Sequence, residues 1–171
     1  KTWPAALTEH DLKRTITRDV TINNPDSTHS SQHQSVTFTR GATYNEVKKQ
    51  VAYDPWSDGG KHTFDAVPIP PIRGYAPSQE VQALAVTPDS SDITETVTYR
   101  ALGQSLVVYY LDLTNKPVGD QVLKGVTDQM IDVDLHLPAG WVLAPGQNVP
   151  KQIKFNGIHN VDMNVYVVHQ I

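Results

Sequence analysis

The sequence predicts a β-dominated α+β fold made of two small modules in tandem. Several runs alternate polar and apolar residues with the two-residue period of a strand buried on one face. Few segments have the longer period of an ordinary helix. Two strand-like runs, residues 96–101 and 106–111, meet around Gly103 with little room for a turn. We therefore predict one module over residues 1–103 and a second over residues 104–171.

The composition is that of an ordinary folded protein. Hydrophobic residues make up 39% and charged residues 19% of the 171 residues, which excludes a disordered chain. The formal net charge of −4 and the absence of a basic stripe give no case for a nucleic-acid partner. No window approaches the roughly 18 apolar residues that a membrane-spanning helix needs. We expect no membrane insertion by this fragment.

Cysteine is absent from the chain. Disulfides, cysteine-based metal sites and cysteine nucleophiles are therefore excluded. The absence agrees with a bacterial exported protein that folds without disulfides. The chain also begins at Lys1 rather than at Met, which favours a mature fragment or an excised repeat of a longer protein.

The first module is predicted to open, after a lead-in at Trp3-Pro4, with a long threonine-rich hairpin. Residues 12–22 and 35–39 both alternate, and the turn-forming residues Asn, Pro, Asp and Ser lie between them. Arg14 and Arg18 share the parity of the apolar residues, which places that face partly at an edge or rim. The exposed edge of this hairpin could add a partner's strand, or its polar residues could simply keep it soluble.

Residues 43–53 leave two alternatives open. Thr43 and Glu46 have capping-box spacing, which favours a helix, whereas Val47, Val51 and Tyr53 also fit a strand. In the rest of this module, residues 54–60 are predicted as a loop and residues 62–69 as a strand. A proline-rich crossing follows, then a short strand or connector over residues 80–86 and a closing strand over residues 96–101.

The second module is predicted to begin with another hairpin. Its strands are residues 106–111 and 118–123, with Asn-Lys-Pro between them. Residues 130–137 alternate as a strand, although a short helix is an alternative. Shorter strands are predicted over residues 141–143, 153–155 and 161–168.

The sequence contains no catalytic signature. We find no G-x-S-x-G, no His-Glu-x-x-His and no glycine-rich phosphate loop, so we expect neither an enzyme nor a cofactor. Asp132 and Asp134 lie two apart, on one solvated face of a strand. His29 and His33 lack the companion ligands that zinc requires, so no metal site is predicted.

The best candidate for ligand binding is the loop that contains Asp54, Trp56 and Asp58. An aromatic ring beside carboxylates suits carbohydrate recognition. The alternative is that Trp56 folds back as a lid on the core. Trp141 and Tyr75, which each follow a glycine, are predicted as core aromatic residues.

Four stretches of the chain together resemble the mucus-binding repeats of large Gram-positive bacterial surface adhesins. They are R-T-I-T-R with S-V-T-F-T-R, Y-D-P-W-S followed by F-D-A-V-P and I-R-G-Y-A-P, E-T-V-T-Y-R running into S-L-V-V-Y-Y-L-D, and N-V-Y-V-V-H. The second half is similar to the mucin-binding-protein (MucBP) module, with Gly140-Trp141 where Gly-Tyr is more usual.

This resemblance implies two β-grasp (ubiquitin-like) modules that form an elongated rod. It also implies adhesion to host mucin glycoproteins, and for some relatives immunoglobulin binding. The parent protein would be extracellular and anchored to the cell wall through parts outside this fragment, beside further copies of the repeat. We expect weak affinity per copy and avidity from many copies. A purely structural spacer is a further alternative. The resemblance assigns no ligand-binding residues.

Overall fold

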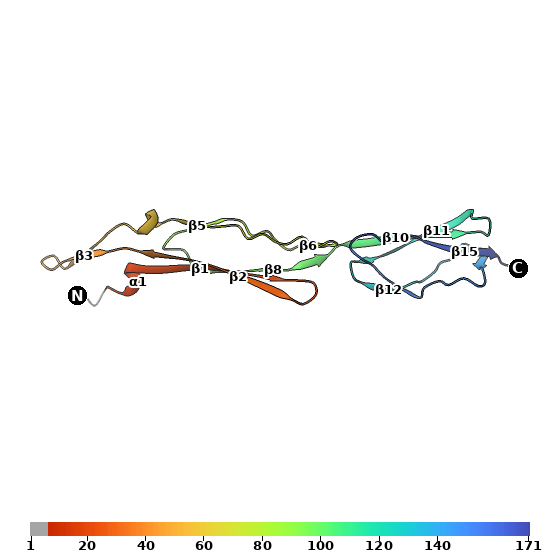
Figure 1. The fold of residues 1–171 in the computed structure, drawn as a ribbon, viewed down its shortest axis with the longest axis horizontal. Helices are drawn as coiled ribbons and strands as arrows, with labels where there is room; N and C mark the ends of the chain where they lie inside the picture. The colour runs from red at the N-terminus through yellow and green to blue at the C-terminus, as the bar shows by residue number, and fades with distance from the viewer. Residues whose placement is uncertain (1–6) are drawn as a thin grey trace. The chain divides into compact units, whose positions relative to one another are not determined.

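The computed structural model of the chain describes residues 7–171, and β-strands dominate them (Figure 1). The helical elements among the described residues are α1 (Glu9–Leu12) and the 3-10 turn η1 (Ser57–Gly60). The predicted β-dominated fold is therefore confirmed. The predicted lead-in at Trp3-Pro4 lies outside the described residues. Neither of the described helices is long and apolar enough to cross a membrane.

The chain forms two compact units. Unit 1 comprises the described residues up to Pro70 together with Pro77–Tyr99, and unit 2 comprises Pro71–Ala76 together with Arg100–Ile171. The chain passes from one unit to the other at three points: after Pro70, within β6 (Tyr75–Pro77) and within β9 (Tyr99–Ala101). β6 and β9 pair as a short two-stranded sheet.

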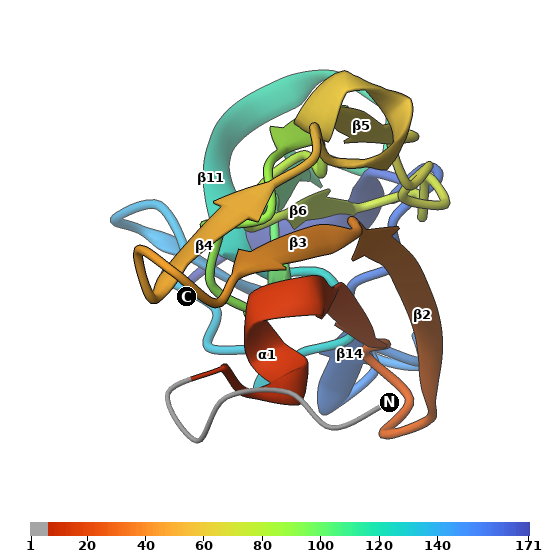
Figure 2. The ribbon, with the colours of Figure 1, turned by 90° about the vertical axis from the view of Figure 1, so that its left-hand side faces the viewer.

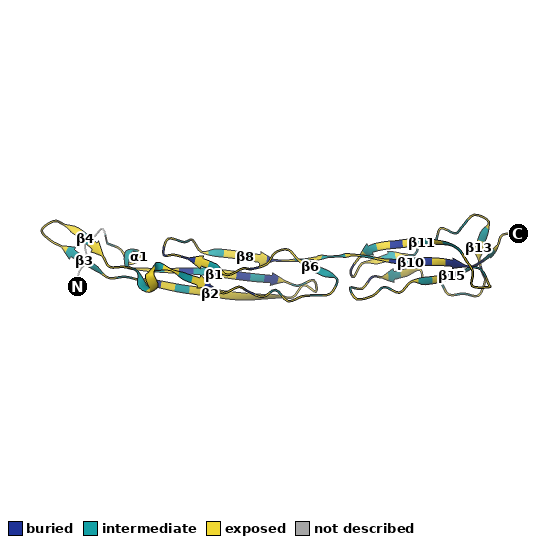
Figure 3. Cartoon of the chain, turned by 90° about the horizontal axis from the view of Figure 1, so that it is seen from above, coloured by how far each residue is buried: buried dark blue, intermediate teal, exposed yellow. Residues whose placement is uncertain are grey.

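Unit 1 is built on a long hairpin. Strands β1 (Lys13–Asn23) and β2 (His29–Thr39) pair antiparallel over their whole length, and β8 (Ile93–Val97) pairs with β1 in parallel. The predicted threonine-rich hairpin is thus confirmed. β2 is exposed along most of its length, whereas β1 alternates between buried and less buried residues (Figure 3).

A second layer covers the inner face of this sheet (Figure 1). It contains β5 (His62–Phe64) paired antiparallel with β7 (Leu84–Val86), and an isolated bridge between Val67 and Val81. The predicted strand over residues 62–69 is therefore shorter than expected. The core between the layers consists of Ile16, Val20, Ile22, Phe38, Phe64, Val67, Val81, Val86 and Val97.

The prediction that the face with Arg14 and Arg18 lies partly at an edge or rim is wrong for Arg18, which is buried. Only 2% of the side chain is exposed, and it lies between the two layers of unit 1. Its guanidinium donates hydrogen bonds to Gln34 Oε1 at 2.7 Å and to the main-chain oxygens of Asp65 and Gln82, each at 2.9 Å. Glu95 supplies the opposite charge at 3.4 Å. The buried cation is tolerated because its donors are satisfied.

Residues 43–53 form strands rather than a helix. β3 (Ala42–Asn45) and β4 (Gln50–Tyr53) make a separate hairpin, seen with α1 at the end of unit 1 that faces the viewer in Figure 2. Asn45 Oδ1 accepts hydrogen bonds from the amides of Val47 and Lys48, and Lys49 adopts a left-handed φ of 53°. This asparagine turn reverses the chain before a helical turn can form.

Unit 2 contains a four-stranded sheet in the order β11-β10-β15-β13. The hairpin of β10 (Gly103–Leu111) and β11 (Pro117–Val126) is confirmed, β15 (Met163–His169) runs parallel to β10, and β13 (Trp141–Leu143) runs antiparallel to β15. The core consists of Leu106, Val108, Tyr110, Leu123, Phe155, Val165 and Val167.

A second, two-stranded sheet lies in unit 2. β12 (Met130–Asp132) pairs with β14 (Gln152–Lys154). The alternating run predicted over residues 130–137 is therefore a strand only at its start. Both units nevertheless share one arrangement: the first strand of the opening hairpin also pairs in parallel with a strand from the end of the unit.

Candidate functional site

The predicted ligand-binding residues all lie between β4 and β5 in unit 1. Trp56 is half-buried and packs against the core cluster of Ile16, Phe38, Phe64 and Val86. Asp54 and Asp58 are exposed. Asp58, Gly59 and Gly60 take consecutive left-handed φ angles of 53°, 65° and 67°, which turn the loop back toward β5. The structure thus gives Trp56 a core contact and leaves both carboxylates in solvent.

Two arginine side chains lie against the aromatic rings of this region. The Cζ atom of Arg40 is 3.9 Å from the ring centroid of Tyr53 and 4.1 Å from that of Trp56. The Cζ atom of Arg14 is 5.1 Å from the Trp56 centroid. We call Tyr53, Arg40, Trp56 and Arg14 the Arg–aromatic stack. A sugar that stacked on Trp56 would have to compete with these cations, whereas the Tyr53 side chain is 43% exposed.

Both arginines of the stack are held in place by further bonds. Arg40 Nε donates to the main-chain oxygen of Asp11 at 2.7 Å, and Arg14 Nε donates to that of His10 at 3.0 Å. Arg14 Nη1 also lies 2.6 Å from Asp89 Oδ1. The stack is therefore a fixed feature of the surface.

Arg14 also lines a polar groove beside the stack. Its volume is about 460 Å³, and it lies between the start of β1 and the turn before β8. Asp92 in its wall is fixed because its Oδ1 accepts the amide of Thr17 at 2.9 Å. The lining residues are His10, Lys13, Arg14, Thr15, Ile16, Pro88, Ser90, Ser91 and Asp92. This lining offers hydroxyl groups and charges of both signs to a polar ligand.

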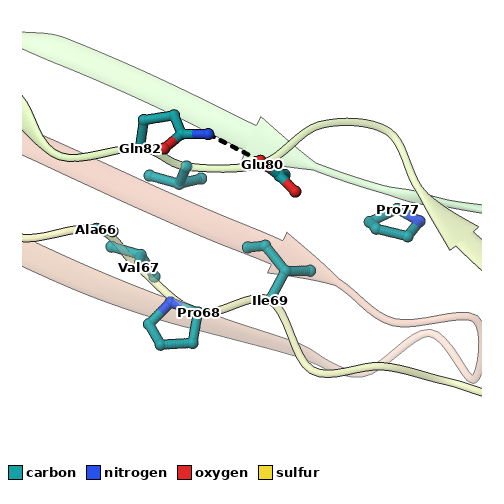
Figure 4. A pocket seen from close by; sticks show the side chains of 8 residues that line it. Ala66, Val67, Pro68, Ile69, Pro77, Glu80 and Gln82 are labelled. Carbon is teal, nitrogen blue, oxygen red and sulfur yellow. Dashed lines mark hydrogen bonds between the residues drawn. The ribbon is translucent and has the colours of Figure 1, made fainter.

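A second groove in unit 1 is mainly apolar (Figure 4). It has a volume of about 290 Å³ and is lined by Ala66, Val67, Pro68, Ile69, Pro77, Glu80, Val81 and Gln82. Gln82 Nε2 donates a hydrogen bond to Glu80 Oε2 at 2.8 Å. The groove can make apolar contacts with a ligand. Its two prolines cannot donate a main-chain hydrogen bond to that ligand, because proline has no N–H group.

Tyr75 and Trp141, the two aromatic residues predicted to lie in the core, both belong to unit 2. Tyr75 is half-buried, and its hydroxyl donates to Asp128 Oδ2 at 2.5 Å, a bond that raises the pKa of Tyr75. Trp141 is also half-buried and packs against the core of unit 2. Its ring stacks on that of His169 with centroids 3.9 Å apart.

No cluster of three or more histidine, aspartate or glutamate side chains that could hold a metal ion occurs within residues 7–171. His29 and His33 both lie in β2, and His33 Nδ1 is 2.5 Å from Asp19 Oδ1 on the neighbouring strand. The described surface of unit 1 offers two grooves, an exposed tyrosine ring and hydrogen-bonding groups.

A family model described as the Muc B2-like domain matches residues 7–103, more than half of the chain. A search of the curated proteins found no match. Several solved structures show similarity. The crystal structure of Mub-RV is 36% identical over 52% of this chain and 53% of that chain, with a TM-score of 0.45. The matched part of the chain thus spans about half of the Mub-RV chain.

The mucin-binding domain of Spr1345 from Streptococcus pneumoniae is 32% identical over 53% of this chain and 92% of that chain, with a TM-score of 0.43. The type 2 repeat of the mucus binding protein MUB from Lactobacillus reuteri is 32% identical over 52% of this chain and 50% of that chain, with a TM-score of 0.38.

Proposed function

The chain belongs to the Muc B2-like domain family, and from this premise we propose that it is a non-enzymatic adhesin repeat that binds host mucin glycoproteins. The observation that carries the proposal is the family match over residues 7–103. The four stretches that resemble mucus-binding repeats support it, because they extend over nearly the whole chain. The parent protein is an extracellular protein of a Gram-positive cell surface, held at the cell wall by parts outside this fragment.

The repeat binds weakly by itself and depends on many copies. The grooves of unit 1 have volumes of about 290 and 460 Å³, and a few polar contacts there would barely exceed the free energy that association costs in lost freedom of motion. Tandem copies turn each later contact into an intramolecular event at high effective concentration. The parallel pairing shared by both units supports two β-grasp modules, over residues 1–103 and 104–171.

An array of the repeat should be retained on immobilised mucin far better than the single repeat. Avidity raises retention by about 10²- to 10⁴-fold over one copy when several sites can engage together. The measurement is surface binding of single and multimeric protein to intact and to deglycosylated mucin, with albumin as the control surface. An array that is not retained on intact mucin refutes the proposed function.

In unit 1, the loop with Asp54, Trp56 and Asp58 is the proposed contact. The two carboxylates accept hydrogen bonds from sugar hydroxyls, while the exposed ring of Tyr53 offers the apolar face. Trp56 does not contact the sugar itself. It holds the loop in position, because its ring packs on the core and against Arg40. Aromatic faces beside carboxylates are suited to carbohydrate.

Replacing both carboxylates, Asp54→Asn with Asp58→Asn, should weaken mucin binding by about three- to tenfold, the loss of one or two hydrogen bonds. Both side chains are exposed, so the melting temperature should stay unchanged. The matched control is Glu46→Gln with Asp120→Asn, which removes the same charge from exposed positions elsewhere. Equal binding by the two double variants would place the contact outside this loop.

A second candidate is immunoglobulin binding through a strand edge. The specific observation is that β2 is the outermost strand of the β2-β1-β8 sheet, so an extended segment of a partner can pair with it. Binding to immunoglobulin G that survives removal of its glycans would favour this candidate. A repeat that bound neither mucin nor immunoglobulin would instead be a structural spacer.

A further inference from the structure

We propose that a shallow pocket in unit 2, which we call the Trp141 pocket, binds one neutral N-acetylhexosamine ring. The pocket has a volume of about 240 Å³, below the roughly 300 Å³ at which sites for drug-sized ligands begin. It therefore has room for a single sugar ring. Its lining residues come from the β10–β11 turn, β13 and β15: Asp112, Leu113, Thr114, Trp141, Val167, Val168 and His169.

One wall of the pocket is a fixed aromatic pair. The register of β13 and β15 sets Trp141 directly opposite His169. Their ring centroids lie 3.9 Å apart with an interplanar angle of 28°, so the rings are stacked. Trp141 also packs against the core of unit 2, which holds the pair in position. The C–H groups of a pyranose ring pack well on such aromatic surfaces.

The polar side of the pocket is supplied by Asp112. Its Oδ1 accepts three hydrogen bonds, from the amide and hydroxyl of Thr114 at 2.8 and 2.6 Å and from the amide of Lys116 at 3.0 Å. The bonds to Thr114 and Lys116 lower the pKa of Asp112, so it is ionised at neutral pH. Within the described part of the chain, Oδ2 accepts no hydrogen bond. That oxygen is available for a sugar hydroxyl.

The lining also selects the class of sugar. The ionised Asp112 carboxylate repels carboxylated and sulfated sugars, which favours a neutral ring. Leu113, whose side chain is 69% exposed, lines the pocket together with Val168 and Val167. These apolar groups suit the methyl of an acetamido substituent. A neutral sugar with an N-acetyl group satisfies both requirements.

This inference rests on the proposed function, because it assigns part of the glycan recognition to unit 2. It differs from the proposed contact in unit 1 in its residues and in its ligand. The two sites can therefore be tested separately, one with monosaccharides and the other with whole mucin.

The test is a titration of the complete chain with N-acetylgalactosamine, N-acetylglucosamine, galactose and N-acetylneuraminic acid, followed by amide and indole NMR shifts. We expect the two N-acetylhexosamines to bind with a dissociation constant on the order of 1 mM, the affinity of a small ligand in a shallow site. The shifts should centre on Trp141, His169 and Leu113. Galactose should bind several-fold more weakly, and N-acetylneuraminic acid should cause no shifts there.

Variants of the pocket give the second readout. Leu113→Glu adds a carboxylate at an exposed position without removing core contacts, and Trp141→Phe keeps part of the aromatic wall. We expect Leu113→Glu to lose N-acetylhexosamine binding at least tenfold and Trp141→Phe to lose several-fold. Val142→Ala is the matched control, because Val142 is an exposed β13 residue that does not line the pocket.

Three results would overturn the inference. The first is sugar-induced shifts that map outside the pocket, and the second is unchanged sugar binding by Leu113→Glu. The third is a dependence of the pocket shifts on protein concentration, which would mean that a second copy of the chain occupies the pocket. Mucin retention that persists in Leu113→Glu while monosaccharide binding is absent in every form would remove the pocket and leave the proposed function standing. Monosaccharide binding at the pocket without mucin retention would support the pocket and refute the proposed function.

Discussion

Replacing Arg18 by alanine should destabilise unit 1 by about 3–5 kcal/mol, the usual consequence of breaking a buried ion pair. The guanidinium joins β1 to both layers, through Gln34 on β2 and through the main-chain oxygens of Asp65 and Gln82. Its removal takes a donor from Gln34 Oε1 and from the Gln82 main-chain oxygen and takes the cation away from Glu95, whereas the Asp65 oxygen still accepts from Gln34 Nε2 at 2.8 Å. It also opens a cavity, because the side chain is only 2% exposed.

Hydrogen exchange measured by mass spectrometry tests this prediction, because peptides from each unit show the stability of that unit separately. Peptides from β1 and β8 should exchange at least 100-fold faster in Arg18→Ala, whereas peptides from β10 and β15 in unit 2 serve as an internal reference. Lys13→Ala is the matched control, because Lys13 is an exposed cation in the same strand. An Arg18→Ala protein that is as protected in β1 as Lys13→Ala would show that the buried network adds nothing to stability.

Arg18 also shows why the sequence predicted the strand but not its role. Alternation over residues 12–22 is local, so it correctly predicts β1 and the buried face that contains Ile16 and Val20. The partners of Arg18 lie on four other segments, and no local pattern reveals that they converge on its guanidinium. An arginine with apolar parity is therefore interpreted as a rim residue, although the fold buries it.

The candidate site also depends on contacts between segments that are far apart in the sequence. The sequence places Asp54, Trp56 and Asp58 in one loop, but Arg14 and Arg40 reach the Trp56 ring from the start of β1 and from the end of β2. Residues 43–53 were ambiguous because their choice between helix and strand depends on the turn at Asn45. The Trp141 pocket likewise requires the pairing of β13 with β15, which the sequence does not specify.

The second large effect is expected at Gly74 in unit 2. Its φ is +83°, and an added Cβ would lie 2.6 Å from Gly157 Cα and from Thr127 Oγ1. The Gly74 carbonyl also accepts hydrogen bonds from the Leu102 amide at 2.8 Å and the Thr127 hydroxyl at 2.7 Å, so the segment cannot easily shift away. We expect Gly74→Ala to destabilise unit 2 by about 3–4 kcal/mol, the sum of a left-handed backbone penalty and overpacking.

Three other glycines of the same unit separate these two causes. Gly103→Ala meets open space at an ordinary φ and should be neutral or stabilising by about 0.5 kcal/mol. Gly140→Ala meets open space at φ +85° and should cost only the backbone penalty, about 1–2 kcal/mol. Gly157→Ala would place its Cβ 2.3 Å from the Arg73 carbonyl oxygen and should cost about 1–3 kcal/mol through the clash.

Hydrogen exchange in β10 and β15 ranks the four variants, because these strands form the centre of the unit 2 sheet. The expected order of protection, from highest to lowest, is Gly103→Ala, then Gly140→Ala and Gly157→Ala, then Gly74→Ala. A Cβ at Gly157 would meet only main-chain atoms, and a Cβ at Gly74 would meet the main-chain Cα of Gly157 as well as the Thr127 side chain. Main-chain atoms cannot rotate away as a side chain can. If Gly74→Ala cost no more than Gly140→Ala, the close approach of the two segments would be absent, and backbone conformation alone would explain the glycine.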